Sequence, residues 1–313
     1  MTRLLFATDV HGSEKCWRKF INAGTFKNVD VLVLGGDITG KVIVPIFQKG
    51  NHKWESDFLE TKYALNGEEE LREHEKIIRY QGFYPYQTNQ KEFDDINADK
   101  EKLDRLFNQV MNETFKEWLR FADERLRNSK IRVFLAPGND DRLEVDSAFE
   151  VSERCLNAEG KVVMIDEYHE MISTGYSNPT PWKTFREESE EDLAKRLESY
   201  VKQLANIPNS IFAFHAPPFD STLDLAPELD ENFRPVEGGS KLIPVGSTAV
   251  REAITKYQPL LGLHGHIHEC SGSFEFSRTL CINPGSQYTE GILCGIIVEF
   301  EKDKIKKWTS FSG

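Results

Sequence analysis

Short apolar runs that end in polar or glycine-rich turns recur along most of the chain. The first covers residues 4–7, the second covers residues 29–34, and apolar positions at helical spacing lie between them over about residues 13–24. This β-α-β pattern predicts buried strands flanked by helices, as in an α/β fold. Similar runs predict strands at residues 131–135, 162–165, 170–174, 210–214, 260–263, 280–282 and 292–300, and an acidic helix at about 187–205.

The pattern changes after Gly40. From about residue 55 to residue 129 the sequence is charged and mostly helical in period, and residues 82–89 are predicted to form the turn between two helical arms. A solvated loop would explain the charged face of these helices but not their apolar stripe. We therefore expect one domain over residues 1–313, with a helical cap inserted at about 41–130.

Composition narrows the class of protein. The 313 residues are 39% hydrophobic and 29% charged, which is typical of a globular protein. No apolar run approaches the roughly 20 residues of a membrane helix, and the first residues run directly into polar Thr8 and Asp9, so we expect no signal peptide. Five scattered cysteines without a CxxC pair argue against disulfides or a zinc ribbon and favour the cytoplasm.

The net charge of −12 argues against non-specific binding to nucleic acid or to an anionic membrane, because both depend on clustered Lys and Arg. An anionic small substrate stays possible. Bound divalent cations would reverse the sign of the charge in a pocket, whatever the rest of the surface carries.

Carboxylate, imidazole and amide side chains gather at the ends of the predicted strands. In open α/β sheets, ligands bind beyond the carboxyl ends of the strands, and this mixed oxygen and nitrogen set suits Mn²⁺, Fe or Zn²⁺. Turn capping is the alternative for the aspartates, and a core position is the alternative for a lone histidine. The clusters are Asp9-Val10-His11, Gly36-Asp37, Gly138-Asn139-Asp140-Asp141, His215 and Gly265-His266-Ile267-His268.

Five such elements in this order resemble the calcineurin-like metallophosphoesterases, whose order is DxH, GDxxG, GNH[DE], a lone His and GHxH. Each element alone is weak, whereas the ordered set is specific. The match covers residues 3–40 and 131–300 and leaves the insertion outside it. Residues 263–269 and 283–286 resemble the prokaryotic small-phosphoesterase branch. The resemblance implies a four-layer αββα sandwich with two mixed β-sheets, an arrangement that the α/β pattern alone does not specify.

The resemblance also implies two divalent metal ions, Mn²⁺ first and Fe, Zn²⁺ or Ni²⁺ as alternatives. It implies hydrolysis of a phosphodiester or phosphomonoester by a hydroxide that bridges the two ions, a chemistry that two ions about 3.5 to 4 Å apart support. Side chains two positions apart share a face, so His266 and His268 can reach neighbouring ions. The implied ligands are Asp9, His11 and His268 for one ion, Asn139, His215 and His266 for the other, and Asp37 as the bridge.

One position departs from the family. Asp140 stands where the family usually has a histidine that protonates the leaving group or holds the phosphate, and a carboxylate beside two cations is a poor general acid because its pKa is expected to be depressed. Three hypotheses follow: a good leaving group, another proton donor with His264 as first candidate, or a loss of catalysis.

Two residues are candidates for substrate binding, and one function competes with hydrolysis. Arg142 could join Asn139 in holding a phosphate oxygen, although a surface salt bridge is the commoner role of a lone arginine. The competing function is a catalytically weak metal-binding scaffold whose helical insertion docks a protein partner. The natural substrate and the oligomeric state stay open.

Overall fold

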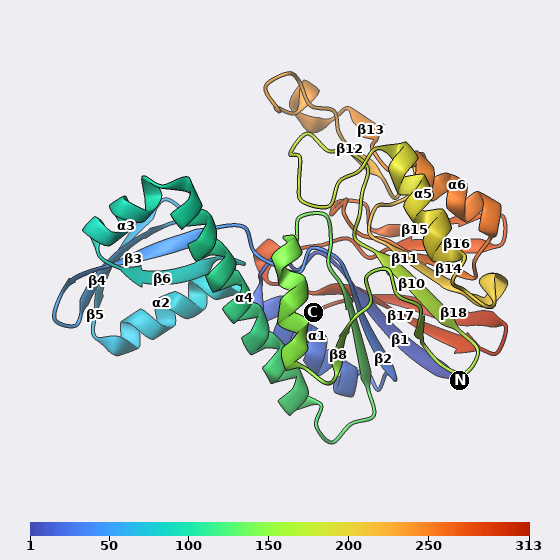
Figure 1. Cartoon of the computed structure of the whole chain (residues 1–313), viewed down its shortest axis with the longest axis horizontal. Helices are drawn as coiled ribbons and strands as arrows, with labels where there is room; N and C mark the ends of the chain where they lie inside the picture. The colour runs from blue at the N-terminus through green and yellow to red at the C-terminus, as the bar shows by residue number, and fades with distance from the viewer.

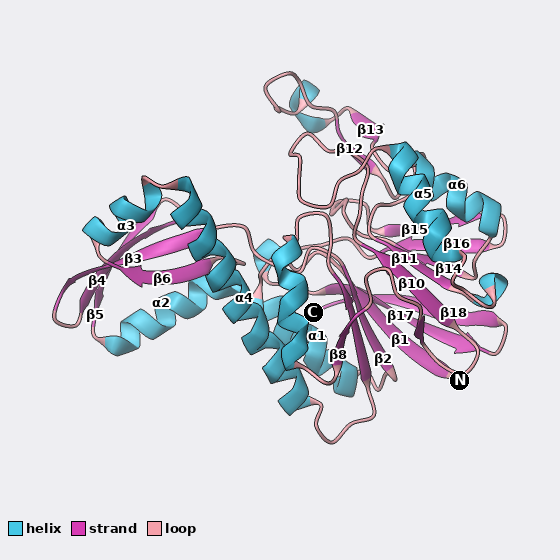
Figure 2. Cartoon of the chain, in the orientation of Figure 1, coloured by secondary structure: helices cyan, strands magenta, loops and turns pink.

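Two six-stranded β-sheets face each other, and helices cover their outer faces, in the computed structural model, which describes residues 1–313 (Figure 1, Figure 2). Each sheet contains both parallel and antiparallel pairs of neighbouring strands, so both sheets are mixed. The first sheet has the order β18 (Lys304–Ser312), β17 (Cys294–Glu301), β1 (Thr2–Ala7), β2 (Val31–Gly35), β7 (Arg132–Ala136) and β8 (Cys155–Asn157). The second has the order β15 (Gly272–Phe276), β16 (Thr279–Asn283), β14 (Leu261–Leu263), β11 (Ile211–Phe214), β10 (Glu170–Thr174) and β9 (Val163–Met164).

Alternation along β1 shows how the layers stack. Leu4 and Phe6 point into the apolar layer between the two sheets, whereas Leu5 and Ala7 point into the layer beneath the outer helices. The first sheet is covered by α1 (Glu14–Phe26) and α4 (Lys100–Arg125), and the second by α5 (Glu190–Val201) and α6 (Thr248–Tyr257). The expected four-layer αββα sandwich is therefore confirmed.

Serine side chains fix the start of three of these helices, α1, α5 and α6. Ser13 accepts a hydrogen bond from the backbone N–H of Cys16 at the start of α1, and Ser247 accepts one from Val250 at the start of α6. Capping places the first turn of α1 directly after the β1 loop. The chain therefore reverses direction within a few residues of Asp9 and His11.

The insertion is not the helical cap that the sequence predicted. It contains a four-stranded sheet that projects from the sandwich at the left of Figure 1, with its own core of seven buried apolar residues. The main contact of the insertion with the main core is α4, where Trp118 stacks on Trp17. The sheet has the order β5 (Thr61–Asn66), β4 (Lys53–Phe58), β3 (Ile43–Gly50) and β6 (Tyr84–Thr88), and its helices are α2 (Glu68–Tyr80) and α3 (Gln90–Asn97).

Exposed charged residues in the strands of this small sheet made its sequence look unlike that of a buried strand. In β4, Trp54, Ser56 and Phe58 are buried, whereas Lys53, Glu55 and Asp57, which alternate with them, are exposed. This alternation with a period of two residues was the available signal for a strand. Likewise, the segment predicted as a turn between helical arms contains β6, which pairs with β3 in parallel.

The remaining elements are short. None of the helices is both long enough and apolar enough to cross a membrane. All five cysteines are free thiols, as their spacing predicted. The short elements are the hairpin of β12 (Leu225–Pro227) and β13 (Leu242–Pro244) and the 3₁₀ segments η1 (Leu143–Val151), η2 (Ile207–Asn209), η3 (Val236–Gly239) and η4 (Tyr288–Glu290).

Candidate metal centre

Seven side chains converge at one edge of the sandwich, where the loops after β1, β2, β7, β11 and β14 meet. Because these strands are parallel within their sheets, their carboxyl ends point to the same edge. The structure thus brings together all the residues that the resemblance implied as metal ligands. We call them the ligand cluster: Asp9, His11, Asp37, Asn139, His215, His266 and His268.

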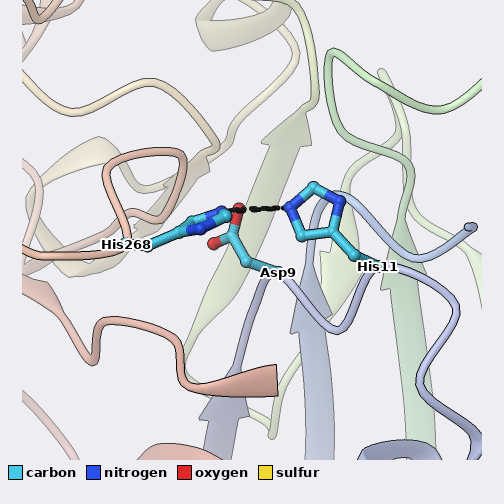
Figure 3. A group of neighbouring side chains, drawn as sticks. All are labelled: Asp9, His11 and His268. Atoms are coloured by element: carbon cyan, nitrogen blue, oxygen red, sulfur yellow. Dashed lines mark hydrogen bonds and ion pairs between the residues drawn. The ribbon is translucent and has the colours of Figure 1, made fainter. Parts of the chain in front are cut away.

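Asp9, His11 and His268 form one half of the cluster, and their polar atoms point toward one another in Figure 3. The Nε2 atoms of the two histidines lie 3.0 Å apart, and Nε2 of His268 lies 3.3 Å from Oδ1 of Asp9. Two ligands bound at about 2.1 Å to one ion and at a right angle stand about 3.0 Å apart. The spacing of this half therefore suits one shared cation.

Asp37, His215 and His266 form the other half, together with Asn139. Oδ2 of Asp37 lies 3.4 Å from Nε2 of His215 and 3.6 Å from Nε2 of His11. Nδ1 of His266 lies 2.8 Å from Oδ1 of Asn139. Asp37 stands between the two halves, which is the position that a bridging carboxylate needs.

Neighbouring groups orient two of the ligands toward this space. The Nδ1–H of His215 donates to the carbonyl of Gly35 at 2.9 Å, which leaves its buried Nε2 without a hydrogen-bond partner beside Asp37. The amide nitrogen of Asn139 donates to Oγ1 of Thr184 at 2.8 Å, so its oxygen faces the cluster. An unpartnered imidazole nitrogen held by a hydrogen bond on its far side is typical of a metal ligand. The residues present therefore fit divalent cations.

Four ligands have a backbone conformation that residues other than glycine rarely adopt. The φ angles of Asp9, His11, Asp37 and His266 are 53°, 41°, 48° and 68°. Each such residue costs on the order of 1 to 3 kcal/mol and persists where the surroundings determine it. The turns after these strands thus aim side chains into the cluster at a cost in stability.

Two glycines are required because ligands occupy the space where a side chain would stand. A Cβ added to Gly36 would lie 2.1 Å from Nδ1 of His215, and one added to Gly138 would lie 2.1 Å from Oδ1 of Asp37. The glycine in each motif therefore lets the ligand of another motif approach the backbone.

Burial and charge set the protonation of the histidines in the polypeptide alone. Burial lowers the pKa of His11 to about 3 and that of His266 to about 4, which keeps both rings neutral. Burial acts on His215 in the same direction, but Asp37 and Asp9 outweigh it and raise the pKa of His215 to about 10. Burial raises the pKa of Asp9 and Asp37, but the neighbouring histidines, His215 first, together outweigh burial, so the pKa of each carboxyl lies below its usual range.

The sequence analysis assigned no role to Asp141, which joins the second and third motifs. Its buried carboxylate accepts hydrogen bonds from the backbone N–H groups of Ile38, Thr39 and Gly138. The Nε–H of Arg186, which is also buried, donates to the backbone carbonyl of Asp141 at 3.1 Å. The [DE] position that closes the third motif was the available signal for Asp141, whereas no local pattern marks Thr184 or Arg186.

The segment after β16 holds the last motif in place. The side-chain amide of Asn283 donates to the carbonyls of Gly265 and Ile267, each at 3.1 Å, and the hydroxyl of Ser286 donates to the carbonyl of Asp9 at 2.7 Å. The resemblance of residues 283–286 to the small-phosphoesterase branch thus has a structural reason: they join the loop of His266 and His268 to the loop of Asp9.

Asp140 lies at the edge of the cluster and forms an ion pair with Lys41. Its backbone N–H donates to Oδ1 of Asp37 at 2.9 Å, and its carboxylate lies 4.0 Å from Nδ1 of His11. Burial and the charge of Asp37 raise the pKa of Asp140 to about 6, although Lys41 lowers it. Without metal ions, the pKa of Asp140 is therefore raised, and the depressed pKa expected from the sequence would need the charge of the two cations. Sequence reasoning did not single out Lys41.

The other two candidates lie away from the cluster. His264 is fully buried, its Nδ1 lies 2.8 Å from the carbonyl of Phe214, and burial lowers its pKa to about 4. Its Nε2 faces β14 and β16, close to Gly262. Arg142 pairs with Asp104 of α4 at 2.5 Å, the salt bridge that was its alternative role.

A cavity of about 730 Å³ opens beside His268 and leads away from the ligand cluster. Polar side chains dominate its lining, among them Glu269, Ser286 and Tyr288. The ring centroid of Tyr288 lies 4.7 Å from that of His11. A small polar molecule therefore has room directly next to the first half of the cluster.

Comparisons with known proteins support the fold. No protein-family model matches the chain. The chain is 31% identical to the uncharacterized protein MJ1162 of Methanocaldococcus jannaschii over 156 residues, which is 49% of this chain and 64%, less than two-thirds, of that protein. One crystal structure matches 99% of both chains with a TM-score of 0.58 at 16% identity. The protein TT1561 of Thermus thermophilus gives a TM-score of 0.51 at 13% identity over 94% of this chain and 93% of its own. At this identity the likeness is one of fold, and it agrees with the sandwich described above.

Proposed function

We propose that this chain, which has the four-layer fold of the calcineurin-like metallophosphoesterases, is a hydrolase of phosphate esters that depends on two divalent metal ions. Asp9, His11 and His268 would hold one ion, Asn139, His215 and His266 the other, and Asp37 would contact both. When bound, the ions supply Lewis acidity that polarises the ester and activates the attacking water.

One observation carries the proposal: ligands from five separate segments of the chain meet in two adjacent groups that share Asp37. Four of them adopt a positive φ, and two neighbouring glycines leave room for their side chains. A cluster built only for stability needs neither feature. Two buried histidine rings, those of His11 and His215, face two carboxylates, and cations that all four groups share explain this better than packing does.

The chain itself would bind and orient the ester. The cavity beside His268 would take the part of the substrate beyond the phosphate, with Tyr288 as its inner wall. Asn139, whose amide nitrogen donates to Thr184, would direct its side-chain oxygen to the second ion and so help to hold the ion that binds the phosphate. We no longer assign proton donation to His264 or phosphate binding to Arg142, because the first is enclosed between strands and the second is paired with Asp104.

Elemental analysis of the purified protein and an ester assay would test the proposal. We expect about two divalent ions per chain, Mn²⁺ first, and turnover of bis-p-nitrophenyl phosphate or p-nitrophenyl phosphate that stops on addition of a chelator. The first substrate would indicate a diesterase and the second alone a monoesterase. The control is Asp37→Asn, which should lose both metal and turnover.

A protein that binds no divalent metal would contradict the proposal. A protein that binds metal but hydrolyses no ester would favour a scaffold instead. In that case, deletion of the insertion should abolish the binding of a protein partner. The cytoplasmic location stays a prediction.

A further inference from the structure

Lys41 is a positive charge at the ligand cluster. It directly follows the GDxxG motif, where the chain leaves the sandwich for the insertion, and its ammonium group pairs with Asp140. The same carboxylate oxygen of Asp140 lies 4.0 Å from Nδ1 of His11, which places the ammonium group of Lys41 at the edge of the cluster. Its side chain stays 51% exposed, so an anion from solvent can reach it.

The charges at the cluster indicate what the ion pair of Lys41 and Asp140 could do. Two divalent ions would bring four positive charges, and Asp9, Asp37 and Asp140 together cancel three of them. A neutral histidine at the position of Asp140 would cancel none, so the change to aspartate removes one charge from the attraction for a phosphate. Lys41 restores it. Burial lowers the pKa of Lys41, but Asp140 and then Asp37 outweigh burial and raise it, so the ammonium is charged at neutral pH.

We propose that Lys41, held in place by Asp140, is the phosphate-binding cation of this site and takes the place of the histidine that the third motif lacks. This proposal rests on the proposed function. The ammonium has three N–H donors, so those not engaged by Asp140 can reach an oxygen of a phosphate at the cluster. Because Lys41 belongs to the base of the insertion, the insertion supplies a residue to the site.

The alternative is a purely structural ion pair that fixes the insertion to the sandwich. Other contacts already do this: the hydroxyl of Ser13 donates to the carbonyl of Tyr80 at 2.8 Å, and the N–H of Gly40 donates to the hydroxyl of Tyr84 at 2.8 Å. A half-exposed ion pair adds at most about 1 kcal/mol to stability. Loss of Lys41 should therefore affect anion binding far more than folding.

Binding of inorganic phosphate to the Mn²⁺-loaded full chain, measured by calorimetry, tests the proposal without relying on turnover. Lys41→Met should weaken phosphate binding by about 10-fold to 100-fold, the effect of losing a charged hydrogen-bond donor, with no change in Mn²⁺ content or unfolding temperature. Lys41→Arg should keep most of the affinity. Lys49→Met is the matched control, because Lys49 also pairs with an acidic residue in the insertion but lies away from the cluster.

A double variant separates the two roles. Asp140→His placed on Lys41→Met restores the histidine of the family pattern and should recover most of the phosphate affinity, whereas a structural pair would not be rescued by histidine. Unchanged phosphate binding in Lys41→Met would overturn the proposal. If the wild type binds Mn²⁺ and phosphate but hydrolyses no ester, the proposed function fails, while the comparison of Lys41 variants still decides this inference.

Discussion

The sandwich and the insertion bury their strands differently. All five residues of β2 are buried, because a sheet covers one face and helices cover the other. In β4 of the insertion every second residue is exposed, and the core contains seven buried apolar residues. Strands that are packed on both faces can hold the residues that follow them in backbone conformations of high energy, such as the positive φ angles of Asp9 and Asp37.

This difference explains how the chemistry is distributed. All seven members of the ligand cluster follow strands of the sandwich. The insertion contributes Lys41, which contacts the cluster only through Asp140 at its edge. We therefore expect changes in the sandwich to abolish metal binding, and changes in the insertion to alter local stability or substrate affinity while the metals stay bound.

The largest expected contrast comes from one methyl group placed in each region. Gly36→Ala should reduce Mn²⁺ affinity by more than about 100-fold, because the new Cβ would displace the ring of His215. Gly50→Ala in the insertion meets no atom within 4 Å and should leave Mn²⁺ affinity unchanged. Calorimetric titration with Mn²⁺ measures both variants. Equal affinities would show that His215 does not need its present position.

The sequence predicted the part of the molecule where local rules decide the structure. The β-α-β pattern and the polar strand ends located the sandwich strands, because parallel strands bring their carboxyl ends to one edge. The glycines of the motifs were informative for the same reason, since Gly36 and Gly138 each make room for a ligand. The sandwich itself came from the resemblance, because periodicity does not specify how sheets pair.

The rest depended on contacts between distant segments. Lys41 and Asp140 lie far apart in the sequence, and nothing beside either residue indicates its partner. Thr184 orients Asn139 through a single hydrogen bond from a loop without a recognisable pattern. The small sheet was missed because charged residues such as Glu55 alternate with Trp54, and the strong helical period of α4 was extended over the whole insertion.

A second contrast compares two neighbouring positions on α2. Ile78 is fully buried in the small core and Ile77 is 46% exposed. Ile78→Ala should destabilise the insertion by about 2 to 5 kcal/mol, whereas Ile77→Ala should have a small effect. Thermal unfolding with and without Mn²⁺ measures this. If Ile78→Ala also lowered Mn²⁺ content in the folded protein, the separation between the two regions would be wrong.

Glu159 in the sandwich and His74 in the insertion should contribute to the pH dependence of stability in opposite directions. Burial raises the pKa of Glu159, beside β10, to about 7. The folded sandwich therefore holds this proton more tightly than the unfolded chain, and the contribution of Glu159 to stability should fall as the pH rises from 4.5 to 7. Glu159→Gln should remove this slope, worth about 3 kcal/mol because each pKa unit corresponds to about 1.4 kcal/mol. Urea unfolding over this pH range measures it, with exposed Glu153→Gln as control.

His74 makes the stability of the insertion depend on pH in the opposite direction. Its ring is buried against Tyr63 without a hydrogen-bond partner, and burial lowers its pKa below the ordinary value of 6.5. The unfolded chain binds this proton more tightly, so the insertion should lose stability as the pH falls below 6.5. His74→Phe should remove the loss, and exposed His52→Gln should not. Hydrogen exchange of the insertion amides, compared between about pH 5 and about pH 7, measures this loss in both variants. An equal loss in His74→Phe and His52→Gln would contradict the assignment to His74.

The central claim is that the ligand cluster holds two divalent cations. Anomalous diffraction from crystals soaked in Mn²⁺ tests it most directly. The account predicts two adjacent manganese peaks, one among Asp9, His11 and His268 and one among Asn139, His215 and His266, with Asp37 in contact with both. Manganese bound elsewhere, or no peak at this edge of the sandwich, would contradict it.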